Sequence, residues 1–182
     1  MPIDLKWGAR SLFHEPALLA GFRARPTDVL ITTAPKAGTT WMQQILHQLR
    51  SGGDESYASI YDVVPWLEFL AEDEDVARVL ANYKRIDNPR VFKTHCTYEQ
   101  TPSVETVRVI LSSRDPRDCC VSYYHHIMGM SGDVRTALSY PADASFEDIY
   151  ERWMTFGAWY RNVRSWWPHR KDNNVLWLRY ED

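Results

Sequence analysis

A short loop of small, polar and cationic residues, PKAGTT (35–40), separates two apolar stretches of the chain. Gly38 permits close approach of the backbone to a ligand, and the free amides at the start of a following helix attract an anion. In a nucleoside triphosphatase the loop glycines precede Lys and Ser/Thr, whereas here Lys36 precedes Gly38, so an ATPase of that kind is disfavoured. The loop predicts a phosphate cradle, and an ordinary turn with an exposed lysine is the alternative.

Arg114 and Ser122 form a second candidate anion site. Arg114 follows an apolar run, and Ser122 comes eight residues later, two turns along a predicted helix. A guanidinium and a hydroxyl so placed can share a second phosphate. Two separate anion sites predict a bisphosphorylated ligand. The alternatives are an ion pair at the helix start for Arg114 and a packing role for Ser122.

The sequence FKTH (92–95) places a lysine and a histidine at the end of another apolar run. Lys93 and His95 are two residues apart, so in a strand their side chains point to the same face. A cation beside a histidine is the arrangement needed to activate a hydroxyl next to a developing anion. A purely structural histidine is the alternative.

These residues need a scaffold in which strands and helices alternate. Asp115 and Pro116 suit the cap and first position of a helix. An acidic segment, 71–80, predicts a solvated helix face with Val76, Val79 and Leu80 inward. The pattern predicts an α/β fold, a parallel sheet flanked by helices with a P-loop-like strand-loop-helix nucleotide site at the carboxyl ends of the strands. Strands are predicted at 28–33, 90–95, 107–113 and 174–180, and helices over about 41–50, from 116, and over 145–167.

Composition limits the remaining classes. At 182 residues and 45% hydrophobic, the chain predicts a single domain, 1–182. A net charge of −3 argues against nucleic acid or an anionic membrane as a partner. The three cysteines lack the spaced pairs of a zinc site or a secreted disulfide framework. With no apolar run of membrane-spanning length, the sequence predicts a soluble, cytoplasmic protein.

Five motifs, taken in order, resemble those of one family. They are TAPKAGTTWMQQIL (33–46), VFKTH (91–95), VILSSRDPRDCCVSYYHH (109–126), TFGAWYRNVRSWW (155–167) and VLWLRYED (175–182). From about Phe22 to Asp182 the chain resembles the cytosolic sulfotransferases, which use 3′-phosphoadenosine 5′-phosphosulfate (PAPS). The resemblance implies transfer of a sulfuryl group to a hydroxyl or amine of a small acceptor. It implies no metal ion, and adenosine 3′,5′-bisphosphate (PAP) as the second product.

The resemblance also implies a role for each matching residue. His95 is the implied general base, Lys36 stabilises the leaving bridging oxygen, and Lys93 supports charge on the sulfuryl group. Arg114 and Ser122 match the pair that holds the 3′-phosphate. The implied donor-binding set is Lys36, Ala37, Gly38, Thr39 and Thr40 for the phosphosulfate, Trp41 and Tyr180 for the adenine, and Arg114 and Ser122.

Three departures qualify the resemblance. Ala37 replaces the usual serine, which removes a hydroxyl from the phosphosulfate end, and Cys96 and Thr97 replace the leucine and proline after the catalytic histidine. The family's C-terminal segment, with a late Arg-Lys-Gly motif, is missing. Two explanations stay open: a truncated or minimal protein, or a site completed by a second chain or a homo-oligomer. A PAPS-binding module that is catalytically weak is the alternative function.

The acceptor pocket is predicted from aromatic residues. The segment before Phe22 and the stretch from Tyr61 to Leu70 are the candidates to line it. Trp66 and Phe69 indicate an apolar ring or chain as the acceptor, and membership of the core is the alternative for both. A nucleotide kinase is disfavoured by the order of Lys36 and Gly38.

Overall fold

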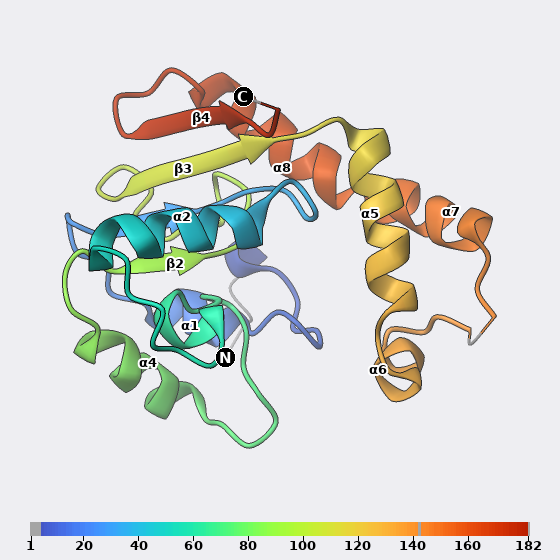
Figure 1. Ribbon diagram of the computed structural model, residues 1–182, viewed down its shortest axis with the longest axis horizontal. Coiled ribbons are helices and arrows are strands. Elements are labelled where there is room, and N and C mark those ends of the chain that lie inside the picture. The colour runs from blue at the N-terminus through green and yellow to red at the C-terminus, as the bar shows by residue number, and fades with distance from the viewer. Residues whose placement is uncertain (1–4, 142, 182) are drawn as a thin grey trace.

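The computed structural model describes residues 5–141 and 143–181 (Figure 1). Its four strands form one parallel sheet in the order β2-β1-β3-β4. The elements in chain order are η1 (Leu5–Trp7), α1 (Pro16–Gly21), β1 (Val29–Ile31), α2 (Thr39–Ser51), α3 (Ile60–Val63), α4 (Val76–Arg85), β2 (Val91–Lys93), β3 (Arg108–Ser113), α5 (Pro116–Met128), α6 (Gly132–Ala137), α7 (Phe146–Phe156), α8 (Ala158–Trp166), η2 (Trp167–His169) and β4 (Val175–Arg179).

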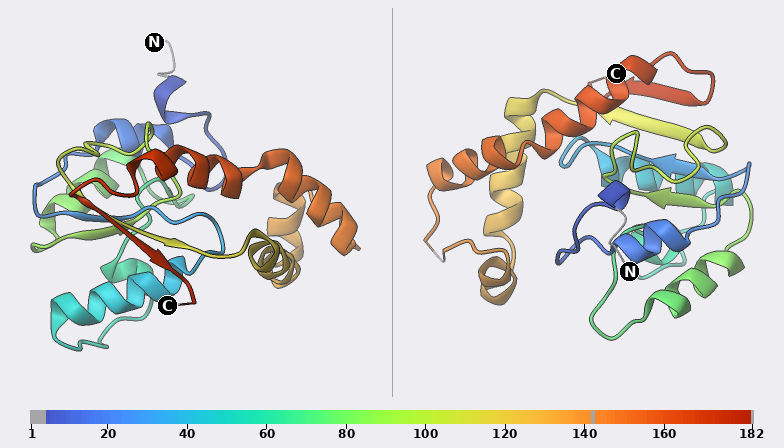
Figure 2. Two further views of the ribbon diagram at one scale, coloured as in Figure 1. Left: turned by 90° about the horizontal axis from the view of Figure 1, so that it is seen from above. Right: turned by 180° about the vertical axis from the view of Figure 1, so that it is seen from behind.

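Helices cover both faces of the sheet. Successive strand residues point to opposite sides, so each strand packs against both helical layers. Leu30 and Phe92 pack with α1, α4 and Trp166 of α8 on one face. Ile31 and Val91 pack with Met42 of α2 on the other face. Figure 2 shows these two layers with the sheet between them. The predicted α/β architecture is therefore confirmed.

A second group of helices lies beyond the carboxyl ends of the strands, where α5, α6 and α7 stand to one side of the sheet (Figure 1). Two small apolar clusters hold this group together. One cluster joins Ala37 of the loop after β1 to Cys119, Cys120 and Trp153. The other gathers Ile127, Tyr140, Ala144 and Ile149. The loop after β1 is thereby fastened to α5 and α7 by packing.

The strands lie where the sequence predicts them but are shorter, and one predicted helix is divided. The helix expected over 145–167 breaks into α7 and α8 at Gly157, which has φ +56° and caps α7. A left-handed residue ends a helix, and glycine adopts this conformation without a Cβ clash. The acidic helix begins at Val76, with Asp75 as its N-cap, and buries Val79 as predicted.

The apolar periodicity of α2 does not mark its buried face. Trp41, Ile45 and Leu49 are exposed, with Leu49 at 75%. The buried residues of this helix are Thr39, Met42, Gln43 and His47. Gln43 Nε2 donates to the Val64 carbonyl, 21 positions along the chain, at 2.9 Å. The inward face of α2 therefore combines buried polar side chains with the apolar contacts of Met42 and Leu46.

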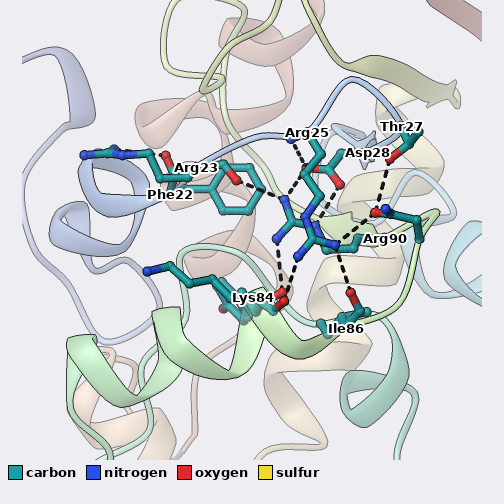
Figure 3. A network of polar contacts seen from close by, with 10 residues as sticks. Phe22, Arg23, Arg25, Thr27, Asp28, Lys84, Ile86 and Arg90 are labelled. Carbon is teal, nitrogen blue, oxygen red and sulfur yellow. Dashed lines mark hydrogen bonds and ion pairs between the residues drawn. The ribbon is translucent and has the colours of Figure 1, made fainter.

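At the amino ends of β1 and β2, a buried ion pair joins the two strands. Asp28 and Arg90 precede the two strands directly, and Arg90 donates from Nε and Nη2 to the two Asp28 carboxylate oxygens at 2.8 and 2.5 Å. Arg90 Nη1 also donates to the Tyr83 carbonyl at 3.0 Å, and Nη2 to the Arg23 carbonyl at 2.9 Å. Figure 3 shows Arg25 beside this pair, with its backbone amide bonded to Asp28 at 2.7 Å.

Candidate active site

A cavity of about 1300 Å³ lies at the carboxyl ends of the strands, where they meet α2 and α5. Residues distant in sequence reach it from the loop after β1, the end of β2, the turn after β3 and the end of β4. The predicted site residues that line this cavity are Lys36, Gly38, Thr39, Thr40, Trp41, Lys93, His95, Arg114, Ser122 and Tyr180.

Ala37 is the predicted site residue whose side chain does not line the cavity. It is fully buried, and its methyl group packs against Ala34, Cys119, Cys120 and Trp153. The side chain that replaces the family's serine thus points into an apolar cluster. In this geometry Ala37 would reach a ligand through its backbone, and the predicted loss of a hydroxyl from the anion site stays a prediction.

The loop after β1 is built from left-handed residues. Lys36 has φ +64° and Gly38 has φ +91°, and Gly38 is the N-cap of α2. A Cβ on Gly38 would lie 2.8 Å from Cδ2 of Tyr180, so the close approach that requires glycine is that of the Tyr180 ring. The Thr39 hydroxyl lies 2.5 Å from the Thr33 hydroxyl inside the protein. Thr39 and Thr40 both line the cavity; the Thr39 hydroxyl is engaged inside the protein, whereas Thr40 is exposed.

Arg114, Tyr180 and Trp41 form one cluster at the edge of the cavity. The Arg114 guanidinium lies 4.5 Å from the centre of the Tyr180 ring, and the Trp41 ring meets Tyr180 edge-on at 5.4 Å. Arg114 Nε is buried with no hydrogen-bond partner in the described part of the chain, and Asp118 lies 3.9 Å away. A buried donor without a partner is costly unless a ligand satisfies it.

The hydrogen bonds of His95 fix its tautomer. Nδ1 lies 2.8 Å from the carbonyl oxygen of Thr33, which can only accept, so Nδ1 carries the proton. Nε2 therefore holds a lone pair, and Lys93 Nζ donates to it at 3.1 Å. Burial, with a further contribution from the Lys93 charge, lowers the pKa of His95 to about 3. His95 is thus a neutral imidazole whose basic nitrogen faces the cavity and Lys93.

Aromatic rings cover the other side of Lys93. Its ammonium lies 3.3 Å from the centre of the Trp66 ring, and Trp66 stacks with Phe13 at 5.7 Å and with Phe69 at 5.5 Å. Tyr61 also stacks on Trp66, at 6.5 Å. Tyr61, Trp66, Phe69 and the N-terminal Phe13 all line the cavity. The aromatic segments predicted from the sequence therefore do reach the cavity.

Basic groups repel one another across the cavity. Burial lowers the pKa of Lys36; Cys119 opposes this shift, and the neighbouring Arg114 charge adds a smaller lowering effect. Burial also lowers the pKa of Lys93 to about 8, with Lys36 contributing and Glu68 opposing. Partial burial and the charges of Lys36 and Lys93 lower the pKa of His126. Such convergence of cations favours a bound anion.

Sequence reasoning missed some residues of this site. His126 lines the cavity one helical turn after Ser122 on α5, a spacing of four that was available as a signal. Glu68 is buried beside Lys93 and His95, and its side chain accepts the His95 amide at 2.8 Å. The sequence carries no local signal for this contact, because Glu68 is separated by 27 positions from His95.

The protein has a parallel sheet flanked by helices, a strand-loop-helix junction and a cavity that gathers Lys36, Lys93 and Arg114. These features define an α/β protein with a P-loop-like nucleotide site. Residues 26–182 match the family described as "Sulfotransferase domain", and the chain belongs to that family.

Several proteins of known name are similar in sequence. The chain is 33% identical to mouse Sulfotransferase 1 family member D1, across 99% of this chain and 60% of that protein. It is 34% identical to mouse Sulfotransferase 1A1, across 90% of this chain and 57% of that protein. It is 32% identical to human Sulfotransferase 1E1, across 88% and 55%. The chain thus spans about 55% to 60% of the length of these relatives.

Solved structures share the fold at lower identity. Mouse sulfotransferase SULT7A1 complexed with PAP aligns with a TM-score of 0.71 at 24% identity, covering 94% of this chain and 58% of that one. Retinol dehydratase in complex with androsterone and the inactive cofactor PAP aligns at 0.70 and 23% identity, covering 90% and 57%. Across the described residues, no helix is long and apolar enough to cross a membrane.

Proposed function

We propose that the protein is a PAPS-dependent sulfotransferase that moves a sulfuryl group to a hydroxyl or amine of a small, apolar acceptor. The observation that carries this proposal is the neutral His95 imidazole, which lines one cavity with Lys36, Lys93 and Arg114. Arg114 Nε has no hydrogen-bond partner among the described residues and only a long ion pair with Asp118. A neutral base beside cations suits deprotonation of a hydroxyl next to a developing anion.

The chain offers two places for the anionic ends of the donor. The first amides of α2 point out of the helix start, and Lys36 stands at the same end of the cavity. Arg114 and Ser122 form the second place, on the turn after β3 and on α5. Trp41 and Tyr180, which contact each other edge to face, provide ring surface against which an adenine would stack. Within the described chain the buried Arg114 Nε has no hydrogen-bond acceptor, and this ligand would supply one.

The proposed reaction uses the chain's residues as follows. PAPS supplies a sulfuryl group on a phosphate leaving group. His95 Nε2 takes the proton of the acceptor as its oxygen or nitrogen bonds to sulfur. The bond between sulfur and the bridging oxygen breaks, and Lys36 stabilises the electron pair left on that oxygen. Lys93 offsets the charge on the sulfuryl group, and the Thr33 carbonyl keeps the His95 tautomer correct.

The acceptor would lie against the aromatic wall. Trp66, Phe69, Phe13 and Tyr61 present ring surface next to the His95 and Lys93 side chains. Ring surface of this kind favours an apolar, flat acceptor. The androsterone and retinol named with retinol dehydratase structures are small apolar alcohols, in keeping with such an acceptor.

Location in the cytoplasm is part of the same proposal. Cys96, Cys119 and Cys120 are buried free thiols, as suits a reducing compartment. A homo-oligomer or a second chain that completes the site also stays a proposal. Sedimentation of the protein with and without PAP tests it, because an assembly that completes the site is expected to be favoured by the nucleotide.

The experiment is transfer of radiolabelled sulfuryl from PAPS to a panel of phenols, alcohols and amines. His95→Ala is expected to lower kcat by about 10²- to 10⁴-fold, the usual value of a general base, and to leave PAP affinity nearly unchanged. His125→Ala, at an exposed position on α5, is the matched control. PAP binding by native protein without any transfer would favour the binding-module alternative, and equal loss of binding and turnover in His95→Ala would refute the base assignment.

A further inference from the structure

Glu68 lies on a segment that is fastened to the end of β2. The Lys93 amide donates to the Pro65 carbonyl at 2.9 Å, and the Leu67 amide donates to the Lys93 carbonyl at 2.8 Å. These two bonds extend the sheet beside Lys93 in the manner of a parallel strand. Glu68, which comes next, is only 2% exposed. Backbone pairing thus places Glu68 directly after the segment bonded to Lys93, and its carboxylate reaches the His95 backbone amide.

The two carboxylate oxygens of Glu68 have different surroundings. Oε1 accepts the His95 backbone amide at 2.8 Å. Oε2 is buried with no hydrogen-bond partner among the described residues, although Glu68 lines the cavity. A buried carboxylate oxygen left unpaired is costly, so its retention calls for a partner that arrives during function.

The Glu68 charge acts on Lys93, although no hydrogen bond or ion pair joins the two side chains among the described residues. Burial and the charge of Lys36 lower the pKa of Lys93, and the Glu68 charge raises it. The other groups around the ammonium are the His95 lone pair, the Trp66 and Tyr61 rings, and His126 on α5, whose own pKa responds to Lys93. Glu68 is therefore the anionic counterpart of Lys93 among its neighbours.

We propose that Glu68 is a positioning residue for sulfuryl transfer, which fixes the His95 backbone and keeps Lys93 protonated beside a neutral imidazole. The inference rests on the proposed function. Lys93 Nζ now occupies the lone pair of His95 Nε2, which must become free to take the acceptor proton. When Lys93 turns away, the unpaired Oε2 of Glu68 and the sulfuryl oxygens become its acceptors.

Glu68→Gln removes the charge but keeps the acceptor for the His95 amide, so it isolates the electrostatic role. The alkaline limb of the pH profile of kcat/KM for PAPS is expected to move to lower pH by about one unit, the usual effect of one nearby charge. Glu72→Gln, exposed four residues further along the chain, is the control and should leave the profile unchanged. An unmoved limb in Glu68→Gln overturns the electrostatic role.

Glu68→Asp keeps the charge but withdraws the carboxylate, so it isolates placement and serves if Glu68→Gln does not fold. It is expected to lower kcat by about 10- to 100-fold with little change in KM for PAPS, since small displacements cost this much. Native kcat in Glu68→Asp overturns the positioning role.

A readout without turnover separates this inference from the proposed function. Nuclear magnetic resonance of ¹³Cε-labelled lysine follows the titration of Lys93 directly, with Lys93→Met to assign the signal. A lower titration midpoint in Glu68→Gln supports the charge effect even if no transfer is detected, in which case the proposed function alone fails. Transfer by the native enzyme together with an unchanged midpoint contradicts the inference alone.

Discussion

An arginine lies at each end of the sheet, Arg90 at the amino ends of the strands and Arg114 at the carboxyl ends, and the two differ in their hydrogen-bond partners. At the amino ends, Arg90 is paired with both Asp28 oxygens and with the carbonyls of Tyr83 and Arg23 (Figure 3). At the carboxyl ends, Arg114 keeps a buried Nε without a partner in the described chain, and its nearest carboxylate is 3.9 Å away. The fold satisfies Arg90 with close hydrogen bonds, whereas Arg114 has a long ion pair with Asp118 and the face of the Tyr180 ring. We propose that a ligand binds Arg114.

The difference suggests that the Arg90 guanidinium serves the fold and that the Arg114 guanidinium serves ligand binding. A buried charge that is fully paired is needed for folding, since removing its partner leaves an uncompensated charge in the interior. A cationic group left unpaired weakens the fold, and an anion that binds there recovers the lost interaction. Four predictions test this contrast, beginning with the largest expected effect.

Asp28→Asn removes the negative charge that pairs with Arg90. It leaves the Arg90 guanidinium buried without its counter-charge, so the free energy of unfolding should fall by about 3–5 kcal/mol in urea titrations. Asp172→Asn, which removes an exposed pair with His169, is the control and should cost less than about 1 kcal/mol. Equal, small losses in the two variants would show that the Asp28 pair does not hold the strands.

Arg114→Ala removes the guanidinium at the carboxyl ends of the strands. PAP affinity should weaken by about 1.5–3 kcal/mol, the range for a charge-assisted hydrogen bond, while the unfolding free energy changes little. Calorimetry measures the first quantity and urea titration the second. Arg117→Ala, three residues on and 88% exposed on its side chain, should leave PAP affinity unchanged. Destabilisation by Arg114→Ala as large as that of Asp28→Asn would remove the contrast.

The pH dependence of PAPS binding in the absence of acceptor tests the role of Lys93, which is proposed to face the sulfuryl group. The Lys93 pKa of about 8 means that the ammonium form, which attracts an anion, dominates below pH 8 and is lost as the pH rises above it. PAPS affinity should therefore fall by up to about tenfold between pH 7 and pH 9. Lys93→Met should flatten this slope. An equal slope in Lys93→Met would assign the titration to another group.

Ala37→Ser is expected to have the smallest effect. The new hydroxyl would enter the cluster of Ala34, Cys119, Cys120 and Trp153 rather than the anion site, so stability should fall by about 1 kcal/mol with PAP affinity unchanged. Thermal unfolding and calorimetry measure the two quantities. A clear gain in PAP affinity would mean that this side chain reaches the nucleotide after all.

Much of the site was predictable because it follows from chain order. A strand, a loop with Lys36 and Gly38, and a helix must place that loop at the carboxyl edge of a parallel sheet, and the ends of the other strands meet there too. The direction of the Ala37 side chain was not predictable, since it depends on how α5 and α7 pack on the loop.

The differences between the predicted and the observed helices also arise from tertiary packing. Gly157 reads equally well as a tolerated helix residue or as a cap, and only the packing of α7 and α8 decides between the two. The apolar positions Trp41 and Leu49 of α2 are exposed because tertiary contacts through Gln43 and His47 set the inward face. The contact of Glu68 with His95 depends on the added pairing beside β2, which no local pattern encodes.

The most direct test of the proposal that Arg114 binds the 3′-phosphate is a calorimetric comparison of PAP with adenosine 5′-monophosphate, which lacks that phosphate. With two anion sites, native protein should bind PAP about tenfold or more tightly than the monophosphate, and Arg114→Ala should abolish most of this preference. Equal affinities for the two nucleotides, or a preference that survives in Arg114→Ala, would contradict the account that the unpaired arginine is there to hold a second phosphate.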